Sequence, residues 1–164
     1  MSTSPAAVAS QGDAIRLNLT MPVTRLGFGP LSFDPVEQMI GAKLSDLLEP
    51  LMTGPVFRRP SDAGPAVEVY PLALPEGEGA TIPLGQFGEV GFKNERGVLV
   101  LTVPWGMTSW LRQKFGDAVV RGPTEGRSLD GTAKVAVVWV RLRAGMRASI
   151  ALGAAGEVGV EAAP

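Results

Sequence analysis

The sequence predicts a β-rich α+β domain in which an antiparallel sheet, sandwich or partly open barrel carries one amphipathic helix. Glycine and proline account for 21 and 14 of the 164 residues, too many interruptions for a helical bundle. A hydrophobic content of 45% argues against general disorder. Several short segments also alternate apolar and polar residues with the period of two that is typical of strands. Short strands joined by many turns satisfy all three observations.

The length suits a single domain. A chain of this size buries about 70% of its unfolded surface, which gives it a sizeable core without disulfides or metals. We expect a flexible N-terminal arm over residues 1–12, rich in Ser, Ala and Gly. One globular domain should then occupy residues 13–161, followed by a short tail over 162–164.

The most strongly patterned segment is residues 134–142, KVAVVWVRL, in which valine and tryptophan make both faces apolar. A strand that is apolar on both faces is typically central in its sheet. Ala144 and Gly145 then offer a turn. Residues 146–152 follow, and their alternation of apolar and polar side chains is typical of a strand with one solvent-exposed face. We predict that these two strands form a hairpin. Residues 98–103, VLVLTV, are a second candidate for a sheet centre.

A second hairpin is predicted where residues 86–93 and 98–103 flank a four-residue loop that ends in glycine. Further strands are predicted over residues 13–20, 66–74, 117–121 and 157–161. Pro71 lacks the backbone N–H that a ladder needs, so the strand over 66–74 is expected at a sheet edge.

The longest helical pattern covers about residues 34–53. Asp34 suits the N-cap, Pro35 the first helical position, and Glu37 stands three residues after the cap. An apolar stripe at helical spacing follows, and we expect it to pack on the sheet. The alternative is a helix whose apolar face docks on a partner or a lipid surface. A second, short helix is expected near residues 108–115.

The composition excludes several kinds of chemistry. The chain has no cysteine and no histidine, so it offers no thiolate nucleophile, no imidazole base and neither of the usual zinc ligands. No phosphate-binding loop, nucleophile elbow or calcium loop is present in the sequence. We therefore expect no catalytic residues, no metal and no cofactor, and the protein is predicted not to be an enzyme.

Charge is distributed unevenly along the chain, whose net charge is −1. Residues 1–107 hold seven basic and eleven acidic side chains, whereas residues 108–147 hold eight basic and three acidic ones. Such asymmetry favours contact with an acidic partner or head-to-tail contact between copies. The alternative is that solvated charges of both signs mix on the folded surface.

Two groups of residues are candidate interface positions. Aromatic and basic side chains alternate within residues 105–115, a combination that is common at interfaces but also in core corners. Three arginines cluster around the turn at Ala144 and Gly145. The candidate interface residues are Trp105, Trp110, Arg112, Lys114, Arg141, Arg143 and Arg147.

These observations favour a non-catalytic structural or assembly protein, such as a subunit of a virion or another multi-copy particle. Its expected partners are other copies of itself or other structural proteins. The alternative is a small module that binds an apolar ligand or lipid beneath the helix. An overall charge of −1 argues against nucleic acid. Neither a signal peptide nor an apolar run of about 20 residues is visible, so we expect a cytoplasmic or virion location without a membrane span.

Overall fold

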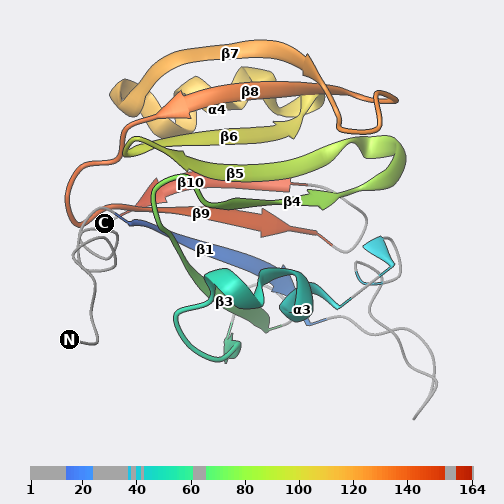
Figure 1. The fold of residues 1–164 in the computed structure, drawn as a ribbon, viewed down its shortest axis with the longest axis vertical. Coiled ribbons are helices and arrows are strands. Elements are labelled where there is room, and N and C mark those ends of the chain that lie inside the picture. Colours follow the sequence, from blue (N-terminus) through green and yellow to red (C-terminus); the bar gives the residue numbers. More distant parts are fainter. Residues whose placement is uncertain are drawn as a thin grey trace.

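The computed structural model describes residues 14–23, 37, 40–41, 43–60, 66–153 and 158–163. The predicted arm over residues 1–12 lies outside them. The described strands form two five-stranded sheets, with the orders β10-β9-β1-β3-β2 and β4-β5-β6-β8-β7 (Figure 1). All pairs are antiparallel except β1 with β9, which is parallel.

The first sheet contains β1 (Ile15–Pro22), β2 (Phe57–Arg59), β3 (Val67–Leu74), β9 (Arg147–Leu152) and β10 (Val158–Ala163). The second sheet contains β4 (Gly79–Pro83), β5 (Glu89–Glu95), β6 (Val98–Pro104), β7 (Val119–Arg127) and β8 (Lys134–Val140).

The helices are short. The α-helices that lie wholly in the described part are α3 (Leu44–Leu48) and α4 (Thr108–Phe115), and its 3₁₀ helices are η2 (Glu49–Leu51), η3 (Gly85–Phe87), η4 (Trp105–Met107) and η5 (Gly116–Ala118). Among the described residues, no helix has both the length and the apolar character needed to cross a bilayer.

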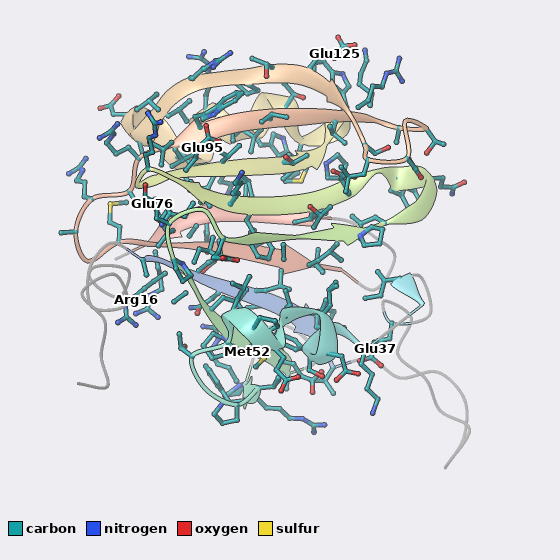
Figure 2. All side chains as sticks on the ribbon, in the orientation of Figure 1. Arg16, Glu37, Met52, Glu76, Glu95 and Glu125 are labelled. Atoms are coloured by element: carbon teal, nitrogen blue, oxygen red, sulfur yellow. The ribbon has the colours of Figure 1, made fainter. Side chains whose placement is uncertain are left out.

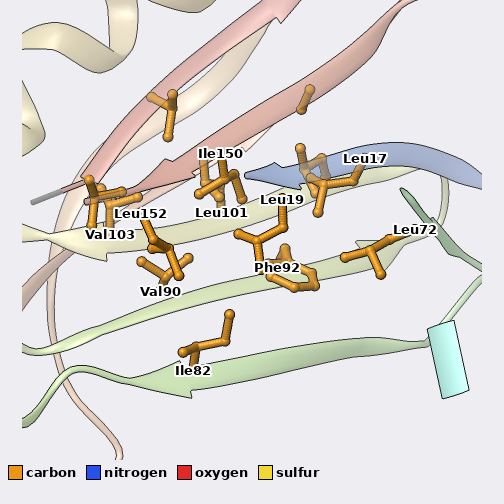
Figure 3. Packing of buried hydrophobic residues seen from close by; sticks show 14 of the residues in the cluster. Leu17, Leu19, Leu72, Ile82, Val90, Phe92, Leu101, Val103, Ile150 and Leu152 are labelled. Atoms are coloured by element: carbon orange, nitrogen blue, oxygen red, sulfur yellow. The ribbon is translucent and has the colours of Figure 1, made fainter. Parts of the chain in front are cut away.

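The two sheets share one hydrophobic core. Leu17 and Leu19 of β1 point into it and meet side chains of the opposite sheet, including Phe92 of β5 and Leu101 of β6 (Figure 3). These four side chains are at most 2% exposed. The alternation on β1 is the cause, because every second residue of a strand faces the same side. The predicted β-rich α+β class is confirmed.

Residues 134–142 and 98–103 are neighbours, since β8 pairs with β6 along its length. The predicted hairpin of residues 134–152 is wrong. Strand β8 already has β6 on one side and β7 on the other, so neither of its edges is open to β9. The turn at Gly145 instead carries the chain across to the first sheet, where β9 pairs with β1 and β10. The hairpin of β5 and β6 is confirmed.

Within the described residues, the helix predicted over 34–53 is interrupted, and the helix that follows the break, α3, is short. Residues 37 and 40 are helical, but Gly41 takes a φ of 75° and Lys43 is extended before α3 begins. A left-handed residue cannot continue a right-handed helix, so the helical stripe is divided. Residues 34–36, 38–39 and 42 lie outside the described part. Leu44 and Leu48 are nevertheless buried, as the stripe predicts, and α4 has the predicted bounds to within a residue.

The strands predicted over residues 13–20, 66–74, 117–121 and 157–161 are present with two changes, whereas β2 and β4 were not predicted. Strand β3 is not an edge strand, because the three-residue β2 lies outside it and pairs only with Val67 to Val69. Pro71 lies beyond the residues that pair with β2, so its missing backbone N–H costs no hydrogen bond to β2. Strand β7 extends to Arg127 instead of ending near residue 121.

Asn94 fixes the corner where the chain leaves β3 in one sheet and enters β4 in the other. Its backbone N–H donates to the carbonyl of Glu78 over 3.0 Å, and its carbonyl accepts from the N–H of Gly77 over 2.8 Å. Its side-chain Nδ2 donates to the carbonyl of Leu74, and Oδ1 accepts from the N–H of Gly97, both over 2.8 Å. Asn94 is fully buried, so these bonds are protected from water.

Gly79 lies at the same corner and allows the two strands to approach closely. A Cβ built on Gly79 would collide with the backbone of Phe92 and Lys93 on β5. Only glycine fits there without moving a strand.

Replacing Asn94 with Leu keeps the branched shape of the side chain but removes both side-chain hydrogen bonds at this corner. We expect the free energy of unfolding to fall by about 3 kcal/mol, since buried polar groups lose their partners. Urea denaturation measures the change. The matched control is Lys93→Ala on the exposed side of the same strand, expected to stay within about 0.5 kcal/mol of wild type. An unchanged midpoint for Asn94→Leu would show that the corner does not need its amide.

Candidate functional site

Three of the candidate interface residues meet in one surface hollow. Trp110 and Lys114 stand one turn apart on the exposed side of α4, which contacts β10. Arg147, at the start of β9, lines the same hollow, as does Arg59 of β2. The hollow has a volume of about 610 Å³ and lies over the outer face of the first sheet. We call it the Trp110 hollow.

The floor of the Trp110 hollow is polar because strand alternation turns the apolar side chains of β1 and β9 inward. Asn18 on β1 stands beside Ser149 on β9, which in turn stands beside Glu161 on β10. Hydroxyl, amide and carboxylate groups therefore run in a row across three strands. Trp110 remains 52% exposed at the rim, so the predicted alternative that it packs in the core does not apply to this side chain.

A second hollow of about 510 Å³ adjoins the first, since Arg147 lines both. It is formed by the start of β1 and by the segment from Leu142 to Arg147. Three arginines line it, namely Arg16, Arg143 and Arg147, and no carboxylate is among its described lining residues. We call it the arginine hollow.

Arg16 and Arg147 are next to each other on adjacent strands. Leu17 pairs with Ala148 in the parallel ladder, and each arginine comes one residue earlier on its strand. Both side chains are exposed on the outer face. Neighbouring strands are about 4.8 Å apart, so two positive charges are held close together, an arrangement that destabilises a sheet. A negatively charged partner at this place would remove that repulsion.

The positive charges of both hollows have no ionic partner within the described part of the chain. The one ion pair there joins Lys134 to Glu125 over 3.6 Å, far from these arginines in the sheet order. Arg16, Arg143 and Arg147 are all exposed and take no part in it. The hollows therefore combine exposed guanidinium groups with an exposed tryptophan.

Trp105 lies elsewhere, at the end of the second sheet. The Lys134 ammonium sits over its ring, 4.8 Å from the centroid, which is within the range of a cation–π contact. A third hollow, of about 580 Å³, is lined by Trp105, Lys134 and Phe87, and Phe87 is also exposed. Leu129, on the nearby β7–β8 loop, is 83% exposed. Three large apolar side chains are thus presented to solvent by loops at this end.

Several hydrogen bonds hold the β7–β8 loop despite its exposure. The N–H of Leu129 donates to the carboxylate of Glu89 over 2.7 Å. The Asp130 carboxylate accepts from the Ser128 hydroxyl and from the N–H and hydroxyl of Thr132, and these bonds lower its pKa from 3.8 to about 2. The backbone that carries Leu129 is therefore bonded on both sides of this residue.

The other two candidate residues are exposed but line none of these hollows. Arg112 lies in the last turn of α4. Arg141 follows β8, and its N–H donates to the carbonyl of Ala118 over 2.8 Å. Sequence reasoning missed Arg16 and Arg59. Arg16 was visible as an outward position of an alternating strand, but its place beside Arg147 depends on the parallel pairing of β1 and β9.

The described residues contain no group of three or more Asp or Glu side chains placed to hold a metal ion. No protein-family model, curated protein or solved structure matches the chain, so its function has to be inferred from its own residues.

Neutralising Arg16 tests whether the paired arginines repel each other. We expect Arg16→Gln to raise the free energy of unfolding of dilute, unassembled protein by up to about 0.5 kcal/mol, because one of two adjacent like charges is lost. Arg112→Gln is the control, since a positive charge in the last turn of α4 is favourable and its loss should not stabilise. Urea denaturation at low ionic strength gives both values. A destabilised Arg16→Gln would show that Arg16 has a favourable partner.

The lowered pKa of Asp130 predicts the pH range over which the loop is held. A carboxylate with a depressed pKa stabilises the folded loop fully above its unfolded value of 3.8, and loses that effect as the pH falls through about 2. We expect the protection factor of the Thr132 amide, which corrects for the intrinsic pH dependence of exchange, to stay constant down to about pH 4 and to fall between pH 4 and 2. Asp130→Ala removes the acceptor oxygen and should show a low protection factor at all pH values. An unchanged protection factor in this variant would contradict the assignment.

Proposed function

We propose that this protein is a non-catalytic structural or assembly protein, such as a subunit of a virion or another multi-copy particle, and that it binds its neighbours through the arginine hollow. The observation that carries the proposal is the set of guanidinium groups at Arg16, Arg143 and Arg147, which form no ion pair with any residue that the structure describes. A sheet gains nothing in stability from holding like charges side by side. Such an arrangement is typical of a surface that is completed by an acidic partner.

Exposed aromatic and aliphatic residues support the same proposal. Trp110 flanks the basic hollows, while Phe87, Trp105 and Leu129 are presented at the end of the second sheet. Tryptophan, phenylalanine and arginine are enriched at protein interfaces. A subunit that contacts more than one neighbour needs at least two such surfaces.

The packing between the sheets favours assembly over the alternative of an internal apolar ligand. Leu19, Ile82, Leu101 and Ile150 are fully buried and fill the space between the two sheets (Figure 3). The three hollows described above all lie at the surface and are lined partly by charged side chains. An apolar ligand would have to displace side chains that already pack against one another.

Sedimentation velocity over a wide concentration range tests the proposal. We expect wild-type protein to assemble, and the triple variant Arg16→Gln, Arg143→Gln, Arg147→Gln to assemble at least about tenfold more weakly, because the positive charge of the arginine hollow is lost. The fold should be intact, since all three side chains are exposed. Circular dichroism checks this.

The matched control replaces three exposed cations that line none of the hollows, Arg58, Lys93 and Arg127, with Gln. It should assemble like wild type. A wild-type protein that remains a monomer at the highest concentration, with no partner, would overturn the proposed function.

A further inference from the structure

We infer that the arginine hollow binds the acidic segment formed by α3 and η2 of a second copy, so that copies associate head to tail. This inference rests on the proposed function and names the partner of the same site. Its basis is that one chain carries both a cationic hollow and an exposed acidic element, placed at different ends of the fold.

The acidic element presents two carboxylates and one apolar side chain. Asp46 and Glu49 stand three residues apart across the junction of α3 and η2, and both are exposed. Residues three apart in a helix lie on the same side, about 5–6 Å from each other. Leu47 between them is 38% exposed. The buried side of the element is formed by Leu44 and Leu48, which fix it to the core.

The two features lie at opposite ends of β1. The strand begins at the arginine hollow, whose lining includes Ile15 and Arg16. In Figure 1 the arrowhead of β1 points toward α3, at the other end of the strand. Figure 2 shows Arg16 and Glu37 on opposite sides of the lower part of the molecule, with Glu37 beside α3. The cationic and acidic features therefore face different directions and cannot meet within one chain.

Other charges lie near each feature without lining the hollow. Glu76 and Glu95 are exposed at the same side of the molecule as Arg16 (Figure 2), but neither lines the arginine hollow. Lys43 is exposed next to α3. The local excess remains positive in the hollow and negative on α3 and η2. This complementarity selects the register in which a second copy docks.

The two surfaces are complementary in their functional groups as well as in the sign of their charge. A guanidinium group binds a carboxylate through two parallel N–H···O bonds, so Arg143 and Arg147 suit Asp46 and Glu49. Leu142 and Met146 are half-buried in the wall of the hollow and give Leu47 an apolar contact. Binding one carboxylate between Arg16 and Arg147 also removes the repulsion between them.

Head-to-tail contact is heterologous, because each copy uses its hollow for one neighbour and its acidic segment for the other. Repetition of this contact gives a ring if the rotation closes and a filament if it does not. Both outcomes produce the multi-copy particle of the proposed function. A symmetric dimer would instead bury the same surface on both copies.

A charge exchange between two variants tests the inference. One variant carries Arg143→Glu and Arg147→Glu, and the other carries Asp46→Arg and Glu49→Arg. Each alone should assemble at least about tenfold more weakly than wild type, since like charges face each other at every contact. An equimolar mixture should recover assembly, because the acidic hollow of one variant then meets the basic segment of the other.

The control variant reverses an acidic pair outside α3 and η2, with Glu76→Arg and Glu95→Arg. Both proposed surfaces are unchanged in this variant, so it should assemble like wild type by itself. Weakened assembly would show that the effect of charge reversal is not specific to α3 and η2. All reversed side chains are exposed, and circular dichroism with urea midpoints confirms that each variant folds. If a charge-reversed variant is unfolded, a neutral double variant of the same surface replaces it. These variants are Asp46→Asn with Glu49→Gln, and Arg143→Gln with Arg147→Gln. Each is expected to weaken assembly.

The outcomes separate this inference from the proposed function. A monomeric wild-type protein overturns both. Wild-type assembly that is unaffected by Asp46→Arg and Glu49→Arg overturns the inference alone and leaves another acidic partner for the hollow. Two variants that are each monomeric and stay monomeric when mixed also overturn it, because the two surfaces then do not contact each other.

Discussion

The fold depends on the corner at which the chain passes from one sheet to the other, and that corner is fixed by the hydrogen bonds of Asn94. Its backbone and amide groups form hydrogen bonds with four residues, Leu74, Gly77, Glu78 and Gly97. Without these bonds, buried polar groups at the junction of β3 and β4 would be left unpaired in the core. The two sheets face each other because this junction holds their ends together, and the shared core follows from that.

The surface hollows are a consequence of the same arrangement. Strand β1 is central in the first sheet, with β3 antiparallel on one side and β9 parallel on the other. The parallel pairing brings the outer face of β1 next to that of β9, so Arg16 comes to lie beside Arg147. Helix α4 then adds Trp110 and Lys114 at the β10 side. A cationic surface is thus assembled from segments that are far apart in the sequence.

The proposed assembly requires a small domain that is stable although the positive charges of its arginine hollow are not neutralised. The core is filled by side chains such as Leu17, Phe92 and Leu101, which are at most 2% exposed. The arginines of the hollow sit outside it, where their repulsion costs only a fraction of the stability of a typical domain. Binding an acidic segment would remove the repulsion between the arginines. This relief would then contribute favourably to the free energy of association.

The sequence by itself determined the class of fold, most strands, the bounds of α4 and the candidate residues Trp110, Lys114 and Arg147, because alternation and helical spacing are local properties of the chain. It did not determine the partner of each strand. The turn at Gly145 has the chemistry of a hairpin, yet β8 is already paired on both sides, and only the tertiary structure decides this. The stripe of residues 34–53 likewise predicted the buried Leu44 and Leu48 but not the break at Gly41. The place of Arg16 beside Arg147 follows from long-range pairing, which depends on the packing of the whole core and on no short pattern.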